Sequence, residues 1–173
     1  MSVIETERLL LKPYEKKDRE DFIRLLSDEN VMQYVGQGVM SVEAAASLWE
    51  KLMDLYARGE DTIWAVFARD DERYMGNASI RPMVERRENW EIGYYLREPE
   101  WDKGFGTELA KRLVEYGFET MGLPAVYATV DYENLASRRI LEKAGMSFHE
   151  ELADEQGPFC LYRTVAPATR RLS

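Results

Sequence analysis

The sequence predicts an α+β fold with a central mixed, mostly antiparallel sheet of six to seven strands and about four helices. Three apolar segments, residues 63–68, 74–80 and 90–96, follow one another with only short charged turns between them, which is typical of antiparallel strands. A long amphipathic helix then ends before Gly122, and another apolar strand follows at 125–130. Strands that gather before a helix, rather than alternating with helices, favour the α+β class.

The length and the charge limit the classes of protein to consider. A chain of 173 residues with 45% hydrophobic content fits one domain, residues 1–173, with 166–173 as a C-terminal tail. It carries 32 carboxylates against 23 basic residues. This acidic balance argues against a nucleic-acid partner and favours cationic partners such as amines.

The sequence also predicts a cytoplasmic protein. No apolar run approaches the length needed to span a membrane, and residues 1–5 lack the basic and apolar regions of a signal peptide. The one cysteine, Cys160, allows no internal disulfide, and without a neighbouring histidine it is interpreted as a small buried hydrophobe rather than a nucleophile. The one histidine, His149, has no partner motif. We therefore expect neither a membrane partner nor a bound metal.

The first third of the chain predicts one strand and two helices. Residues 8–13 are rich in leucine and end at a proline, which suits a short strand. Asp18 is placed to cap a first helix. A loop is expected at 30–38, and Ser41 is placed to cap a second helix that reaches Tyr56.

The last third predicts a helix between strands. Residues 131–134 lead into a helix that ends at Gly145, and strands are expected at 148–151 and 159–165, joined by a turn at 154–158. The apolar residues of the helix recur at helical spacing, and we expect them to face inward: Ala136, Ile140, Leu141 and Ala144.

A turn that contains two glycines joins the strand 90–96 to the long helix. Gly104 and Gly106 would let the backbone approach a ligand closely, and the unpaired N–H groups and positive dipole of the first helical turn favour a phosphate there. The third glycine of a dinucleotide-binding motif is missing, because Leu109 and Ala110 follow, and the lysine of a P-loop is missing too. The turn therefore predicts a pyrophosphate cradle, with structural glycines as the alternative.

Two segments resemble landmarks of the GNAT N-acetyltransferase superfamily. The first, 101–108, is similar to the coenzyme A signature Q/R-x-x-G-x-G/A, with Trp101 in place of Gln or Arg, which is typical of the RimJ/RimL-like branch. The second, 134–146, resembles N-x-x-S followed by Glu-Lys-x-Gly and a hydrophobic residue. The resemblance covers nearly the whole chain, and it implies a GNAT fold whose sheet is splayed between its fourth and fifth strands, 90–96 and 125–130.

The resemblance implies acetyl-CoA as cosubstrate. Its pantetheine arm would lie in the splayed gap, hydrogen-bonded to the strand backbone around Tyr95 and Leu96 and to Asn134, for which a helix N-cap is the alternative role. Lys103 would add a point charge at the phosphates, unless it is only a surface lysine. The residues implied for the phosphate turn are Trp101, Lys103, Gly104, Phe105, Gly106 and Thr107.

Two further residues are implied to take part in catalysis. Glu91 stands where many GNAT enzymes place a strand glutamate that accepts the proton of the amine, directly or through water; a solvated edge carboxylate or an ion-pair partner is the alternative. Ser137 falls near the expected sulfur position and is a candidate for protonating or hydrogen-bonding the thiolate, with a helix-surface serine as the alternative. Leu141 stands where many relatives have a tyrosine acid, which argues against a tyrosine-acid mechanism.

These features predict an acetyl-CoA-dependent N-acetyltransferase that transfers the acetyl group to a primary amine by direct attack in a ternary complex. RimJ/RimL-like relatives imply the α-amine of a protein N-terminus, of which about a tenth is neutral at pH 7. A small-amine or antibiotic N-acetyltransferase and a non-catalytic acyl-CoA-binding module remain open, and an ATP-binding regulator lacks the expected lysine and metal-binding motifs. Homodimers occur in the family, although no stretch of this sequence indicates an interface.

Overall fold

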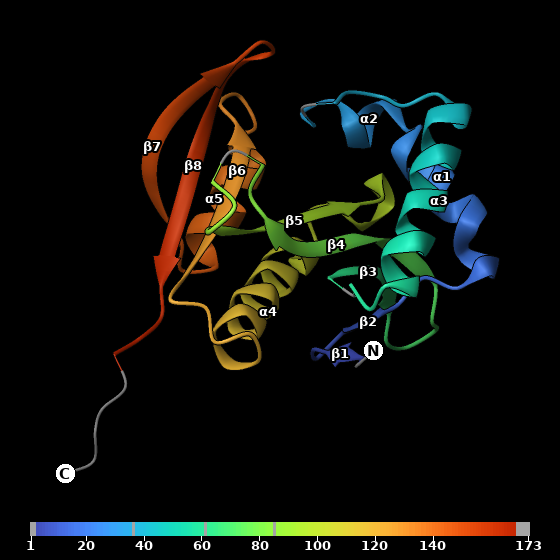
Figure 1. Ribbon diagram of the computed structural model, residues 1–173, viewed down its shortest axis with the longest axis horizontal. Helices are drawn as coiled ribbons and strands as arrows, with labels where there is room; N and C mark the ends of the chain where they lie inside the picture. The colour runs from blue at the N-terminus through green and yellow to red at the C-terminus, as the bar shows by residue number, and fades with distance from the viewer. Residues whose placement is uncertain (1–2, 36, 61, 85, 169–173) are drawn as a thin grey trace.

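A mixed sheet runs through the whole computed structural model, which describes residues 3–35, 37–60, 62–84 and 86–168 (Figure 1). Within these residues the sheet has eight strands in the order β1-β2-β3-β4-β5-β6-β8-β7, and every neighbouring pair is antiparallel except the parallel pair β5–β6. The α+β class is thus confirmed. The strands are β1 (Ile4–Glu5), β2 (Leu9–Lys12), β3 (Ile63–Ala68), β4 (Tyr74–Pro82), β5 (Trp90–Leu96), β6 (Ala125–Asp131), β7 (Ser147–Asp154) and β8 (Gly157–Val165).

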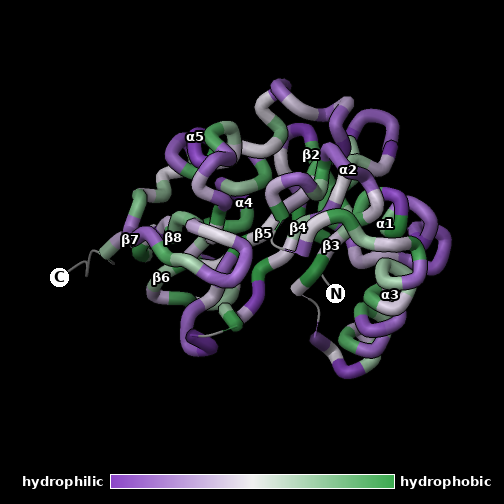
Figure 2. The backbone as a smooth tube through the Cα atoms, turned by 90° about the horizontal axis from the view of Figure 1, so that it is seen from above, coloured by the Kyte–Doolittle hydropathy of each residue, from purple (hydrophilic) through white to green (hydrophobic). Residues whose placement is uncertain are grey.

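Helices cover both faces of the sheet. One face packs against α4 and α5, whose apolar residues form the larger core cluster with β3, β4, β5 and β6, and the other packs against α1 and α3 (Figures 1 and 2). Figure 2 shows hydrophobic and hydrophilic residues in alternation along α3, beside the hydrophobic β3. The helices are α1 (Arg19–Leu26), α2 (Glu29–Met32), α3 (Val42–Ala57), α4 (Phe105–Glu119) and α5 (Leu135–Lys143). Among the described residues, every helix is too short or too polar to cross a lipid bilayer.

The described residues form eight strands and five α-helices, against the expected six to seven strands and about four helices. The additional strand is β1, whose two residues are too few to show an alternating pattern. The additional helix is the single turn α2, which overlaps the start of the predicted loop 30–38. The Asp28 side chain caps α2 by accepting from the N–H groups of Asn30 and Val31. One helical residue was also misplaced, because Ala136 is exposed rather than inward-facing.

The strands β5 and β6 are paired at a single position, Glu91 with Tyr127. By contrast, β5 pairs with β4 over its whole length, from Leu96 opposite Gly76 to Trp90 opposite Pro82. Beyond the Glu91–Tyr127 pair the facing edges of β5 and β6 separate, as the resemblance implied. Because backbone groups are obligatory hydrogen-bonding groups, these two open edges are where an extended ligand could pair with the sheet.

Candidate active site

Glu91 lies at the base of the gap between β5 and β6. It is 9% exposed, and strand alternation directs its side chain away from α4, since its neighbour Ile92 belongs to the α4-side core. The Thr129 hydroxyl donates to Glu91 Oε2 at 3.2 Å, and Arg81 Nε lies 3.6 Å from Oε1. The carboxylate is therefore held in one orientation by a neighbour on each side, and the ion pair considered as its alternative role is present.

The gap-facing backbone of β5 belongs to alternate residues. The Arg97 N–H donates to Met75 O at 2.8 Å, toward β4, so the preceding residue Leu96 and, two residues earlier, Tyr94 present their N–H groups toward the gap. The backbone carbonyl of Tyr95 points toward β4 instead. Its oxygen lies so close to Gly76 on β4 that a Cβ added there would collide with it. Of the two backbone positions implied for pantetheine, the N–H of Leu96 is thus the one directed into the gap.

The glycine turn forms the N-terminus of α4. Gly104 is its N-cap residue with φ of +79°, a left-handed conformation that favours glycine. Gly104 has no side chain with which to cap the helix, so the N–H groups of the first turn, from Phe105 to half-buried Thr107, are left for solvent or an anion. Trp101, 41% exposed, donates from its indole N–H to Leu96 O at 2.8 Å and so ties the turn to the end of β5.

The second glycine of the turn has a packing role. A Cβ at Gly106 would lie 2.9 Å from Ile140 Cδ1, so the absence of a side chain lets the first turn of α4 approach the second half of α5 closely. The side chain of Lys103 is exposed, and its ammonium nitrogen lies 4.0 Å from Glu100 Oε2. Lys103 is therefore available to a phosphate at the cost of only a long ion pair with the buried Glu100.

An N-terminal clamp holds the glycine turn in place. We define the clamp as Thr6, Arg8 and Glu108: the Thr6 hydroxyl, the Arg8 backbone N–H and Arg8 Nε all donate to the Glu108 carboxylate. Arg8 also donates from Nη1 to Lys103 O at 2.9 Å, and its guanidinium lies 4.3 Å from the centre of the Phe105 ring. Burial alone would raise the pKa of Glu108, but these hydrogen bonds outweigh it and hold the pKa below its usual range.

Sequence reasoning missed the contribution of Arg8. Glu108 was part of the RimJ/RimL-like turn pattern, whereas nothing in the local sequence around Arg8 indicates that it contacts a turn 95 residues later. The same holds for Arg81 and Thr129, which meet Glu91 only through the pairing of three strands.

The N-terminus of α5 faces the gap from the other side. Asn134 is the N-cap of α5, and its Oδ1 accepts from the Ser137 N–H at 3.1 Å. The cap role considered for Asn134 is therefore present, and its amide NH₂ group is not needed for it. Ser137 is half-buried and lies close to the buried hydroxyl of Tyr94.

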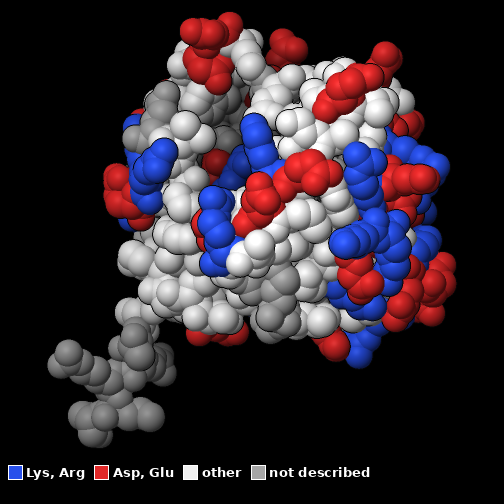
Figure 3. Space-filling view, turned by 45° about the vertical axis from the view of Figure 1, so that its right-hand side comes forward, with Lys and Arg blue, Asp and Glu red and all other residues white. Residues whose placement is uncertain are grey.

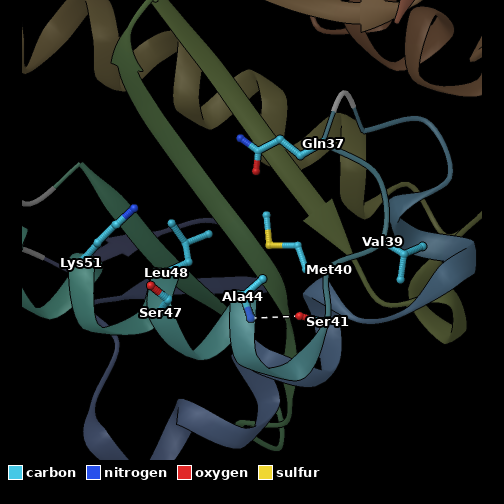
Figure 4. Close-up of a pocket in the computed structure, with 8 residues that line it drawn as sticks. All are labelled: Gln37, Val39, Met40, Ser41, Ala44, Ser47, Leu48 and Lys51. Atoms are coloured by element: carbon cyan, nitrogen blue, oxygen red, sulfur yellow. Dashed lines mark hydrogen bonds between the residues drawn. The ribbon is translucent and has the colours of Figure 1, made fainter.

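A groove lies beside α3, on the face of the sheet that packs against α1 and α3. It has a volume of about 400 Å³ and lies between the loop that precedes α3 and the first turns of that helix (Figure 4). Figure 4 shows Gln37 reaching over the groove toward the strands and Lys51 at its far end. Among the described residues its lining contains no carboxylate: Gln37, Val39, Met40, Ser41, Ala44, Ser47, Leu48 and Lys51.

Surface charge offers no large field of one sign on the face seen in Figure 3, where basic and acidic side chains are interspersed around a hollow. Within the part of the chain that the structure describes, no three His, Cys, Asp or Glu side chains gather closely enough to hold a metal ion. Cys160 is buried, as expected. The groups around the gap that could take part in chemistry include Glu91, the hydroxyl groups near α5 and the strand backbone.

Comparison with known proteins identifies the family. A family model described as an acetyltransferase (GNAT) domain matches residues 8–147, which is most of the chain. The chain belongs to the GNAT acetyltransferase family. This confirms the family and the RimJ/RimL-like branch implied by the two sequence landmarks. Like other GNAT enzymes, the protein is an acetyl-CoA-dependent N-acetyltransferase.

Individual GNAT relatives agree over nearly the same span. The uncharacterised N-acetyltransferase YoaA of Bacillus subtilis is 31% identical over 144 residues, which are 83% of this chain and 81% of YoaA. The spermidine N(1)-acetyltransferase of Escherichia coli K12 is 28% identical over 156 residues, 84% of this chain and 76% of that enzyme. A GNAT-family acetyltransferase structure from Bacillus anthracis superposes with a TM-score of 0.80 at 26% identity, covering 95% of this chain and 98% of that one.

Proposed function

We propose that this GNAT enzyme transfers acetyl from acetyl-CoA to the α-amino group of a protein or peptide N-terminus, with both substrates bound at once. The observation that carries the proposal is the position of Glu91. Its carboxylate is buried at the one paired position of β5 and β6, and it points to the same face of the sheet as the groove beside α3. A base at that position can meet an amine that enters from the groove side.

The proton chemistry favours an α-amine. An amine attacks a thioester only when it is unprotonated, and the usual pKa of an α-amino group is about 7.7 to 8.0 against about 10.4 for lysine. A single carboxylate is a modest base, so it suits the more acidic of the two ammonium groups. Thr129 and Arg81 fix the orientation of Glu91 and would aim one oxygen at the amine proton.

The opposite side of the gap suits the acyl donor. Acetyl-CoA supplies an activated acetyl group as a thioester. We assign its phosphates to the free N–H groups of Gly104, Phe105, Gly106 and Thr107 and to the Lys103 ammonium, with Trp101 holding the turn against β5. The backbone near Tyr95 and Leu96 and the free amide of Asn134 would hold the pantetheine arm, and Ser137 would donate a hydrogen bond to the sulfur.

The residues that line the groove favour one class of acceptor. A polyamine or an aminoglycoside carries several positive charges, which need carboxylates nearby, and among the described lining residues the groove has none but does have Lys51. A neutral or acidic peptide following the amine fits this lining better. A small amine is the second candidate, because the E. coli relative acts on spermidine and this chain has a net charge of −9.

The test measures release of the CoA thiol from acetyl-CoA with a panel of acceptors: free and N-terminally acetylated peptides, lysine peptides, spermidine and an aminoglycoside. We expect release with free N-termini, faster for a peptide with acidic residues after the first than for one with basic residues there. Release that persists with blocked N-termini, or that occurs only with spermidine or the aminoglycoside, would overturn the proposed acceptor.

A further inference from the structure

The hydroxyl of Tyr94 is buried without a hydrogen-bond partner in the part of the chain that the structure describes. Tyr94 lies on β5 and packs against the core on the α4 and α5 side, and its backbone N–H faces the gap. A phenol usually finds a partner when it is buried, since an unpaired hydroxyl costs free energy. The Tyr94 hydroxyl therefore remains able to donate a hydrogen bond to a neighbouring group.

Ser137 is the neighbour that can fill that role. Its side chain is close enough to Tyr94 to oppose the rise in pKa that burial causes, although the two hydroxyls fall short of hydrogen-bond geometry. Asn134 holds the Ser137 backbone at 3.1 Å, so only the serine side chain needs to turn. Ser137 is half-buried, whereas the Tyr94 hydroxyl has no access to solvent. Of the two hydroxyls, that of Ser137 is therefore the one accessible to a ligand in the gap.

We propose that Tyr94 is a positioning residue: its hydroxyl donates to the Ser137 oxygen and thereby directs the serine O–H toward the sulfur of coenzyme A. The inference rests on the proposed function, and it adds a second hydroxyl on the leaving-group side. Leu141, buried on the same helix as Ser137, supplies no hydroxyl of its own. The phenol on the leaving-group side is thus supplied by Tyr94 on β5 and not by a residue of α5.

The chemistry of the pair is hydrogen bonding rather than proton transfer. As the amine nitrogen bonds to the acetyl carbon, the carbon–sulfur bond breaks, its electron pair goes to sulfur and the amine proton goes to Glu91. Burial raises the pKa of Tyr94 to about 12, well above the value of about 8.5 typical of a cysteine thiol. The phenol therefore keeps its proton and stabilises the thiolate through Ser137, and the thiolate takes a proton from water when coenzyme A leaves.

The two functional faces are separated by this arrangement. Glu91 points to the α1 and α3 side of the sheet, and Tyr94 and Ser137 lie on the α4 and α5 side. The gap between β5 and β6 joins the two sides. The carboxylate that accepts a proton and the hydroxyls that face the developing thiolate are thus kept apart by the sheet itself, and neither can neutralise the other directly.

The test compares binding of coenzyme A and desulfo-coenzyme A by calorimetry at pH 9, where most thiols with a pKa of about 8.5 are ionised. The variants are Tyr94→Phe, Ser137→Ala and the double variant, with Tyr116→Phe on α4 as a control. Hydrogen bonds to charged groups correspond to roughly a 10- to 100-fold preference. We expect wild type and Tyr116→Phe to prefer coenzyme A by at least about tenfold, and the other three to lose that preference to the same extent. If Tyr94→Phe does not fold, Tyr94→Met takes its place.

Each outcome decides the inference. If Tyr94→Phe keeps the wild-type preference, or if the losses in the two single variants multiply in the double variant, Tyr94 does not act through Ser137 and the proposal is wrong. Equal losses with an unchanged melting temperature support it, as does a lower kcat at an unchanged KM for acetyl-CoA. These results are independent of the acceptor: absence of turnover on every amine would overturn the proposed function, while the binding preference would still test the Tyr94–Ser137 pair.

Discussion

Arg8 donates from Nε to Glu108 Oε2 at 2.7 Å and so joins the segment before β2 to the first turn of α4, 100 residues later. The same guanidinium reaches the carbonyl of Lys103 inside the glycine turn. The turn that we assign to the phosphates is therefore supported from outside by a residue that does not itself need to touch the ligand.

Removal of this support is expected to weaken binding of acetyl-CoA. Arg8→Ala loses the side-chain hydrogen bonds to Glu108 and Lys103 and keeps only the backbone N–H bond to Glu108. The turn should therefore become less ordered, and the dissociation constant should rise about five- to tenfold, equivalent to about 1 kcal/mol. Arg8→Lys should recover little, because lysine lacks the planar fork. Calorimetry checks both, with Arg24→Ala, which breaks only an exposed pair with Glu20, as the control. Unchanged affinity in Arg8→Ala would show that the turn is rigid without the clamp.

The pKa of Glu108 predicts how the stability depends on pH. Its folded pKa is depressed, so its contribution is present above the unfolded value of about 4.3 and is lost as the pH falls through the folded pKa. Glu108→Gln should therefore lower the free energy of unfolding by about 1–2 kcal/mol at pH 7 and by much less at pH 3. Urea unfolding at several pH values measures this difference. Glu43→Gln, in the exposed first turn of α3, is the matched control, and a cost independent of pH would contradict the prediction.

Glu91→Gln tests the base. The amide keeps an oxygen for the Thr129 hydroxyl but cannot accept a proton, so kcat should fall roughly a hundredfold and the activity should shift to higher pH, where more of the amine is already neutral. The pH dependence of kcat/KM for a peptide acceptor provides the measurement. Glu88→Gln, in the exposed turn before β5, should leave the profile as it is. An unchanged profile in Glu91→Gln would remove Glu91 from the base role.

Lys51→Glu tests the acceptor class. Reversal of the charge in the groove should slow acetylation of peptides with acidic second and third residues several-fold and speed that of spermidine, because the lining then offers a partner to a cation. Initial rates with the two acceptors measure the effect. Lys111→Glu, on the exposed side of α4, applies the same change in net charge away from the groove. If both variants change the rates alike, the groove does not hold the acceptor.

Gly76→Ala tests the fit between β4 and β5. The added Cβ would collide with the Tyr95 carbonyl, a backbone atom that can move only with its strand, so we expect a loss of about 1–3 kcal/mol in the free energy of unfolding. Gly93→Ala meets only the Ser79 hydroxyl oxygen at 3.1 Å, which can rotate away, and should cost less. Urea unfolding of the two variants, compared with wild type, gives the answer; equal stability would mean that β5 shifts freely.

Local patterns in the sequence predicted most of the fold. The strand at 90–96 has the expected bounds, Ser41 caps α3, and Gly122 and Gly145 adopt the left-handed conformation that ends a helix. Each of these features depends on side chains within a few positions of one another. The strand β1 and the helix α2 were missed because two and four residues are too few to establish a period.

The site was less accessible to such reasoning. The position of Glu91 between Arg81 and Thr129 depends on strand pairing, and the clamp on Glu108 depends on a contact across 100 residues. Gly106 was expected to make room for a ligand, yet its nearest constraint is Ile140 on a helix that the sequence does not place beside it. The sequence could indicate a role for Glu91 and Gly106 from their residue types. It could not indicate which residues contact them, because those contacts depend on the tertiary structure.

The single paired position between β5 and β6 has a consequence for solubility. Two strands with open edges lie in the middle of the sheet, and an unpaired edge is a template for any extended chain, including another copy of the protein. A bound acyl donor would cover these edges. We therefore expect the protein to aggregate more slowly on mild heating when its gap is filled, which light scattering with and without acetyl-CoA would show.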